Sequence, residues 1–168
     1  VDIKWLTAED VVTRANETKS SINRVFLVGH VNIRACVLGD DDRKPDSNEL
    51  VKMEQELREA METGAFGMSS GLVYPPGCYA KTDELITLCK IVRGYNGIYA
   101  THMRSEGDEL EAALSETINI SKESGVKSHV SHIKTWGEKN WWKIDKIESL
   151  LEDARAEGIE ITCDRYPY

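Results

Sequence analysis

The sequence contains no apolar run near the roughly 20 residues that cross a membrane. It also has no excess of basic residues: 21 lysines and arginines stand against 29 aspartates and glutamates, for a net charge of −8. A nucleic-acid-binding face needs the opposite balance of charge. Residues 1–5 show neither the charged nor the apolar region of a signal peptide. We therefore expect no membrane partner and no nucleic-acid partner.

The cysteine spacing and the glycine patterns likewise give no evidence of a zinc-finger, redox or nucleotide-binding site. The four cysteines, Cys36, Cys78, Cys89 and Cys163, form no C-x-x-C pair and show no zinc-finger or redox signature. The favoured interpretation is four reduced thiols in a cytoplasmic protein. Neither G-x-G-x-x-G nor G-x-x-x-x-G-K-[ST] follows any expected strand, which counts against nucleotide binding.

The apolar residues, 40% of the chain, gather in short runs that end in polar clusters. Five runs are predicted to be strands, at residues 25–29, 65–69, 98–102, 128–132 and 159–164. Segments with helical periodicity separate them, and the strands start roughly 30 to 40 residues apart, as in βαβ units. The fold class is therefore α/β with a parallel sheet. Five units could be most of a doubly wound sheet or part of an eight-unit barrel.

Capping residues and periodicity predict the helices around these strands. The first begins after Thr7 and runs to about Ser21. The others are expected from Glu49 to Thr63 with Ser47 or Asn48 as the cap, from residues 82–84 onward, from residues 105–108 to near Gly125, and over residues 141–157 with Ile144 facing inward.

Two histidines, His102 and His132, end consecutive strands. The carboxyl ends of parallel strands meet at one edge of a sheet, so we expect both imidazoles at a common mouth. Neutral imidazole is a good zinc ligand, and this geometry points to a metal-dependent hydrolase. The alternative for each ring is a hydrogen-bonded histidine at a helix N-terminus. If the strand continues to residue 133, His132 and Lys134 share one face, while His129 points to the other face and is structural.

Other polar residues near strand ends leave their roles open. His30 is either a ligand or a polar staple between loops, and Asp164 is a base, a metal ligand or an acceptor that fixes a loop. Several cations and phenols could hold a substrate carboxylate or polarise a carbonyl: Lys134, Arg104, Arg165, Tyr74, Tyr79 and Tyr166. Trp136, Trp141 and Trp142 either close a pocket or pack the start of a helix.

Five segments together resemble the N-acyl-D-amino-acid deacylases (D-aminoacylases) of the amidohydrolase superfamily. They occur in order and at consistent spacing over most of the chain. They are Gly-His-Val-Asn-Ile-Arg at 29–34, Gly-Met-Ser-Ser-Gly-Leu-Val-Tyr-Pro-Pro-Gly at 67–77, Thr-His-Met-Arg-Ser-Glu-Gly at 101–107, Ser-His-Ile-Lys at 131–134 and Asp-Arg-Tyr-Pro-Tyr at 164–168.

The resemblance implies a partial TIM (β/α)8 barrel of the metal-dependent hydrolase type. Residues 1–168 would be the central segment of its catalytic domain, with about five parallel βα units that match strands three to seven. It implies that His102 and His132 are zinc ligands and that Tyr74, Lys134 and Tyr166 bind a small-molecule N-acyl amino acid. The implied reaction hydrolyses an N-acyl-D-amino acid to a carboxylate and a D-amino acid, through metal-activated water.

The family's other metal ligands and its general base are expected outside this chain. We therefore expect the segment alone to be inactive, and its open sheet edges to favour self-association. Two alternatives remain from the sequence: a related amidohydrolase that acts on a cyclic amide or imide, and a non-enzymatic α/β domain that binds a ligand or partner.

Overall fold

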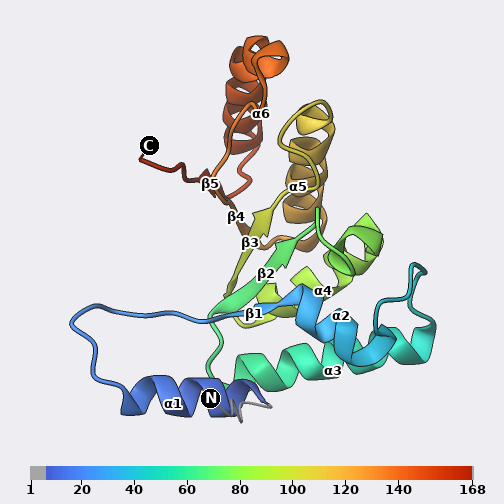
Figure 1. Ribbon diagram of the computed structural model, residues 1–168, viewed down its shortest axis with the longest axis vertical. Helices are drawn as coiled ribbons and strands as arrows, with labels where there is room; N and C mark the ends of the chain where they lie inside the picture. Colours follow the sequence, from blue (N-terminus) through green and yellow to red (C-terminus); the bar gives the residue numbers. More distant parts are fainter. Residues whose placement is uncertain (1–6, 168) are drawn as a thin grey trace.

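The computed structural model describes residues 7–167. The expectation for residues 1–5, and Tyr168 at the end of the last motif, lie outside the described residues. One sheet of five parallel strands runs through the molecule in the order β1-β2-β3-β4-β5 (Figure 1). The strands are β1 (Leu27–Gly29), β2 (Gly67–Gly71), β3 (Ile98–His102), β4 (Lys127–Val130) and β5 (Ile161–Cys163).

The order of the strands decides between the two architectures that the sequence left open. A doubly wound sheet reverses its strand order at a switch point. Here each new strand pairs with the previous one and the order never reverses. The helices that connect the strands also contact one another in sequence, α3 with α4, α4 with α5 and α5 with α6, along one side of the strands (Figure 1). This is the arrangement of consecutive barrel units.

The helices are α1 (Ala8–Glu17), which lies beside α3, and α2 (His30–Leu38), α3 (Ser47–Thr63), α4 (Thr82–Gly94), α5 (Leu110–Ser124) and α6 (Ile144–Ala156). Two short 3-10 helices, η1 (Gly77–Tyr79) and η2 (Glu138–Lys143), lie in loops that follow strands. None of the described helices is long and apolar enough to cross a membrane. All four cysteines are free thiols.

Several predicted boundaries are wrong by a few residues, for local reasons. Helix α1 ends at Glu17 and β1 begins only at Leu27, so the expected helix and strand are both shorter. The side chain of Asp46, rather than Ser47 or Asn48, caps α3 by accepting hydrogen bonds from two backbone N–H groups. In the 105–109 segment the Ser105 hydroxyl accepts from backbone N–H groups in a turn, and α5 starts only at Leu110.

Two helices depart further from the expectation. Helix α2 was not predicted, because its buried face contains His30 and Arg34 beside apolar residues and the periodicity is hidden. Helix α6 begins at Ile144, after the 3-10 helix η2, and the Ile144 side chain is 53% exposed instead of inward. The rest of the α6 pattern holds, since Ile147 and Leu151 are buried.

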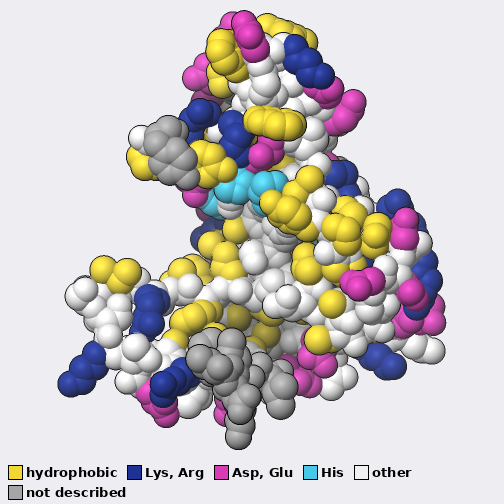
Figure 2. Space-filling view, viewed as in Figure 1, with side chains coloured by type: hydrophobic (Ala, Val, Ile, Leu, Met, Phe, Trp, Pro, Cys, Tyr) yellow, Lys and Arg dark blue, Asp and Glu magenta, His cyan; other side chains and the backbone are white. Residues whose placement is uncertain are grey.

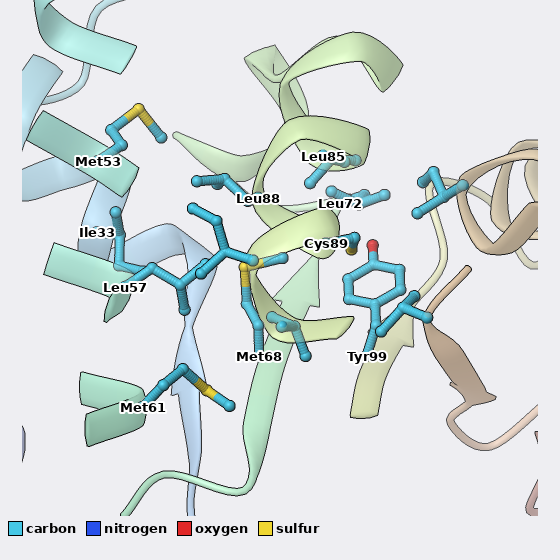
Figure 3. Close-up of a cluster of buried hydrophobic side chains, with 14 of the residues drawn as sticks. Ile33, Met53, Leu57, Met61, Met68, Leu72, Leu85, Leu88, Cys89 and Tyr99 are labelled. Carbon is cyan, nitrogen blue, oxygen red and sulfur yellow. The ribbon is translucent and has the colours of Figure 1, made fainter. Parts of the chain in front are cut away.

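The core lies between the sheet and the helices. One cluster fills the space between β2, β3 and helices α2 to α4, and Figure 3 shows Leu57, Met68, Leu88 and Tyr99 meeting there. A second cluster of buried side chains lies under α5 and α6. Along β3, Tyr99 and Thr101 point into the core, where Ser70 Oγ contacts their hydroxyl oxygens at 2.7 and 2.8 Å. Ala100 and His102 therefore face the other side of the sheet, which the helices leave open.

A buried ionic network joins α2 to α4. Glu84, in the first turn of α4, accepts from Arg34 Nη1 at 2.5 Å and contacts His30 Nε2 at 2.7 Å. The side chains of His30 and Arg34 are fully buried. Arg34 also donates to the backbone carbonyl of Arg43 at 2.6 Å, which ties down the loop before α3. Of the two roles considered for His30, a ligand or a polar contact that joins two segments, the structure shows the second.

Replacing Glu84 by alanine should leave a guanidinium buried without its carboxylate. Because an uncompensated buried charge is costly, we expect the free energy of unfolding to fall by about 3–5 kcal/mol. Urea denaturation of the purified chain, followed by circular dichroism, measures this change. The control is Asp83→Ala in the same turn, which removes an exposed pair with Lys44 and a 3.2 Å hydrogen bond from the Glu84 backbone N–H, and should cost less than about 1 kcal/mol. Equal losses for the two variants would contradict the role given to the network.

Candidate metal centre

Two imidazole rings meet at the carboxyl ends of β3 and β4. His102 is the last residue of β3, and His132 lies two residues beyond the end of β4. His102 Nδ1 and His132 Nε2 face each other at 3.0 Å, and the ring centroids are 4.6 Å apart. The predicted convergence of these two histidines on one mouth is confirmed.

The backbone reaches this geometry by a route that the sequence did not indicate. Strand β4 ends at Val130, so simple alternation does not extend to His132. His132 has a φ of +43°, a left-handed conformation that is uncommon for residues other than glycine. The turn is held by a hydrogen bond from the His132 backbone N–H to Asp164 Oδ1. Asp164 therefore fixes the loop that aims the His132 ring.

His129 also belongs to this hydrogen-bond system, and its predicted orientation is wrong. It pairs with Ala100 across the sheet, and so it lies on the same open face as His102. Its ring nitrogens lie 2.8 Å from Thr162 Oγ1 and 3.0 Å from Asp164 Oδ2. The hydrogen bond with His129 is the main cause that lowers the pKa of Asp164 below its usual range. A charged Asp164 is the form that accepts from both partners.

Glu106 completes the cluster and offers an acceptor to His132. Its Oε1 atom is 2.8 Å from His132 Nδ1 and also accepts a hydrogen bond from Lys134 Nζ. An ionised carboxylate can only accept hydrogen bonds, so in the tautomer that donates to Glu106 the proton of His132 is on Nδ1. The lone pair of His132 is then on Nε2, directed at His102. A carboxylate behind a histidine is the usual arrangement around protein-bound metals.

The donor set fits a divalent transition-metal ion. One ligand atom from each of His102, Glu106 and His132 lies within 4.8 Å of the others, on partly buried side chains. Burial lowers the pKa of His102, the Glu106 charge opposes this, and the charges of His132 and Lys134 lower it further. The neutral ring that results is the form that binds metal. Imidazole nitrogens with a carboxylate beside them are donors that Zn²⁺ prefers.

Aromatic rings and one cation surround the two histidines. The Tyr74 ring lies 5.4 Å from the His102 ring, and the Tyr166 ring stacks on His132 at 5.4 Å. Lys134 Nζ is 4.9 Å from the centre of the Tyr166 ring and 3.0 Å from His132 Nδ1. Figure 2 shows the histidine surface as a cyan patch on the hollowed side of the molecule, with hydrophobic side chains on both sides of it. The three residues predicted to bind substrate thus stand around the histidine pair.

The remaining candidates lie elsewhere or serve the scaffold. Arg165 Nη1 is 3.4 Å from the Ile133 carbonyl, and Tyr79 belongs to η1. Arg104 pairs with Glu116 on α5. The indoles of Trp136, Trp141 and Trp142 do not pack the start of α6, since they are 73%, 62% and 67% exposed.

Sequence reasoning missed Glu106, the residue that contacts both His132 and Lys134. It was expected in the first turn of a helix, where an acidic residue has an ordinary explanation in the helix dipole. The available signal was its position four residues after a strand-ending histidine, in a segment that contains Gly107.

Comparisons with known proteins place this geometry in a family. No family model matches the chain. A D-aminoacylase from Alcaligenes xylosoxydans xylosoxydans is 38% identical over 159 residues, which are 95% of this chain and 33% of that protein. The crystal structure of N-acyl-D-glutamate deacylase from Bordetella bronchiseptica, complexed with zinc and a phosphonate inhibitor, superposes with a TM-score of 0.92 at 32% identity. It covers 96% of this chain and 34% of that one.

A more distant structure supports the fold alone. L-hydantoinase from Arthrobacter aurescens superposes with a TM-score of 0.62 at 14% identity, and it covers 96% of this chain and 36% of that one. The sheet and its outer helices are thus part of an amidohydrolase (β/α)8 barrel. The chain spans about a third of the length of the curated relatives it matches. On this likeness, which extends over nearly all of its residues, the chain belongs to the D-aminoacylase family of N-acyl-D-amino-acid deacylases.

Proposed function

We propose that residues 1–168 form the central segment of the catalytic barrel of a zinc-dependent hydrolase that cleaves N-acyl-D-amino acids into a carboxylate and a D-amino acid. The observation that carries the proposal is the approach of His102 Nδ1 and His132 Nε2 to 3.0 Å at two neighbouring strand ends. The relatives named D-aminoacylase and N-acyl-D-glutamate deacylase, the latter crystallised with zinc, support the choice of metal and reaction.

In this proposal His102 and His132 hold zinc, and Glu106 keeps His132 in the tautomer that can do so. Bound zinc would supply a polarised amide carbonyl and a water of lowered pKa. The two histidines are fewer than the roughly three protein ligands of a usual catalytic zinc site. We therefore propose that the other ligands and the general base come from the rest of a longer protein, and that this segment alone is inactive.

The substrate carboxylate or acyl carbonyl is proposed to meet Lys134, Tyr74 and Tyr166. The Lys134 side chain is only 14% exposed, and its ammonium contacts Glu106 at the edge of the histidine pair. A partly buried ammonium attracts a carboxylate more strongly than a solvated one, because less water screens it. The Tyr74 ring lies beside His102 and the Tyr166 ring beside His132, and each tyrosine carries a hydroxyl group. The four free thiols agree with a cytoplasmic location, which we propose for the protein.

The activity is tested in the full-length protein with matched N-acetyl-D- and N-acetyl-L-amino acids. We expect hydrolysis of the D-series. Lys134→Met should raise KM roughly 10- to 100-fold, because a hydrogen bond to a charged group contributes about 1.5–3 kcal/mol. Lys139→Met, which removes an exposed lysine that pairs with Asp108, is the control and should leave KM unchanged. Preference for the L-series, or turnover of a cyclic imide alone, would refute the assignment.

Zinc binding is measured in the same protein by competition with a chromogenic chelator. His102→Ala and His132→Ala should each abolish stoichiometric zinc. Glu106→Ala should weaken zinc binding about 10- to 100-fold, as loss of a carboxylate behind a ligand histidine typically does. Glu109→Gln, an exposed residue in the same connection, is the control. Zinc that stays bound in both histidine variants would show that the metal lies elsewhere.

The two edges of the sheet support a proposal about self-association of the 168-residue chain. Within the described residues, β1 and β5 each pair on one side only, which leaves two rows of backbone groups without a strand partner. We propose that the isolated chain forms dimers or larger species. Light scattering after size exclusion should give a mass above the 18.9 kDa of one chain. A concentration-independent monomer would contradict this expectation.

A further inference from the structure

The side chain of Arg104 joins three segments of the chain. It follows β3 by two residues, and its guanidinium forms a two-pronged contact with Glu116 on α5: Nε donates to Oε2 at 2.9 Å and Nη2 to Oε1 at 3.0 Å. The same group donates to two backbone carbonyls of the loop after β2, from Nη1 to Cys78 at 2.9 Å and from Nη2 to Ala80 at 3.0 Å. Arg104 thus holds the loop between β2 and α4 against α5.

Glu116 is itself held in place. Thr82, at the start of α4, donates a hydrogen bond to Glu116 Oε1 at 2.8 Å. The side chains of Arg104 and Glu116 are 32% and 14% exposed, so the pair is shielded from much of the solvent. A two-pronged pair between arginine and a carboxylate fixes direction as well as distance. The pair is therefore suited to positioning the backbone that it contacts.

The loop that this pair holds carries Tyr74. The carbonyl of Tyr74 accepts a hydrogen bond from the N–H of Cys78 at 2.9 Å, and the carbonyl of Cys78 accepts from Arg104. The loop joins β3 at its other end, where the N–H of Leu72 donates to the His102 carbonyl at 3.0 Å. Tyr74 is 59% exposed, and its ring lies against Gly71 at the end of β2 and beside His102. Its place beside the His102 ring thus depends on these backbone contacts.

We propose that Arg104 is a positioning residue for substrate binding: through Glu116 and the Cys78 and Ala80 carbonyls it fixes the loop that presents Tyr74 to the histidine pair. The inference rests on the proposed function for its kinetic part only. Arg104 touches neither the substrate site nor the facing imidazole nitrogens. It acts through the backbone that carries Tyr74.

A lysine cannot take over this role, although it keeps the charge. Arg104 makes four hydrogen bonds in one plane to acceptors on two segments. An ammonium is a compact donor without the fixed fork of a guanidinium, so it can satisfy only some of these acceptors. Arg104→Lys therefore tests the geometry of these hydrogen bonds while keeping the charge. Arg43→Lys is the matched control, because Arg43 makes a two-pronged pair with Glu49 at 2.6 and 2.7 Å, at the start of α3.

The first test measures amide hydrogen exchange by mass spectrometry in the full-length protein. Arg104→Lys, and separately Glu116→Gln, should raise exchange in the peptide that contains residues 72–81, while Arg43→Lys leaves this peptide unchanged. The readout does not depend on catalysis. Unchanged exchange in both site variants overturns the inference, whatever the activity of the protein.

The second test is a double-mutant cycle with Tyr74→Phe on an N-acetyl-D-amino acid. Arg104→Lys alone should lower kcat/KM about tenfold, mainly through KM, with unchanged zinc content. In the Tyr74→Phe background the same change should cost less than about twofold. Equal losses in both backgrounds, or a loss of zinc, overturn the inference. If the unaltered enzyme hydrolyses no N-acyl-D-amino acid, the proposed function and the kinetic role of Arg104 both fail, while the exchange data still decide whether Arg104 holds the loop.

Discussion

The candidate site depends on the contact between two imidazoles at neighbouring strand ends. Parallel pairing of β3 with β4 brings their carboxyl ends to one edge, and Thr101 pairs with Val130 in register. His102 then needs only the alternation of β3 to face away from the core. His132 needs a turn, a left-handed backbone and the carboxylate of Asp164 to reach it. The site is thus built by sheet register on one side and by loop hydrogen bonds on the other.

Charged residues in the connection after β3 position the other groups around the two histidines. Glu106 contacts His132 and Lys134, and so links the proposed zinc ligands to the lysine that is proposed to bind the substrate. Arg104, two residues earlier, turns the other way and holds the loop of Tyr74. The same short connection between β3 and α5 therefore serves both the ligand side and the substrate side of the mouth. This division explains why the connection stays non-helical up to Leu110.

The sequence predicts the parts of this fold that depend on periodicity. All five strands, the helix from Glu49 to Thr63 and the meeting of His102 with His132 follow from apolar runs and from the rule that parallel strands end together. Features set by side-chain hydrogen bonds escape such reasoning. Glu106 was expected as an acidic residue at the start of a helix. The buried His30 and Arg34 hide α2, because the carboxylate that pairs with both, Glu84, lies 50 or more residues further along the chain. The predicted orientation of His129 was wrong because the alternation of side chains along a strand was extended past the end of β4.

The central claim is that one zinc ion joins the two facing nitrogens. Zinc-edge anomalous diffraction from crystals of the full-length protein tests it most directly. The account predicts an anomalous peak at about 2.0–2.1 Å from both His102 Nδ1 and His132 Nε2. A zinc peak bonded to neither ring, or two rings that bind separate ions far apart, would contradict it.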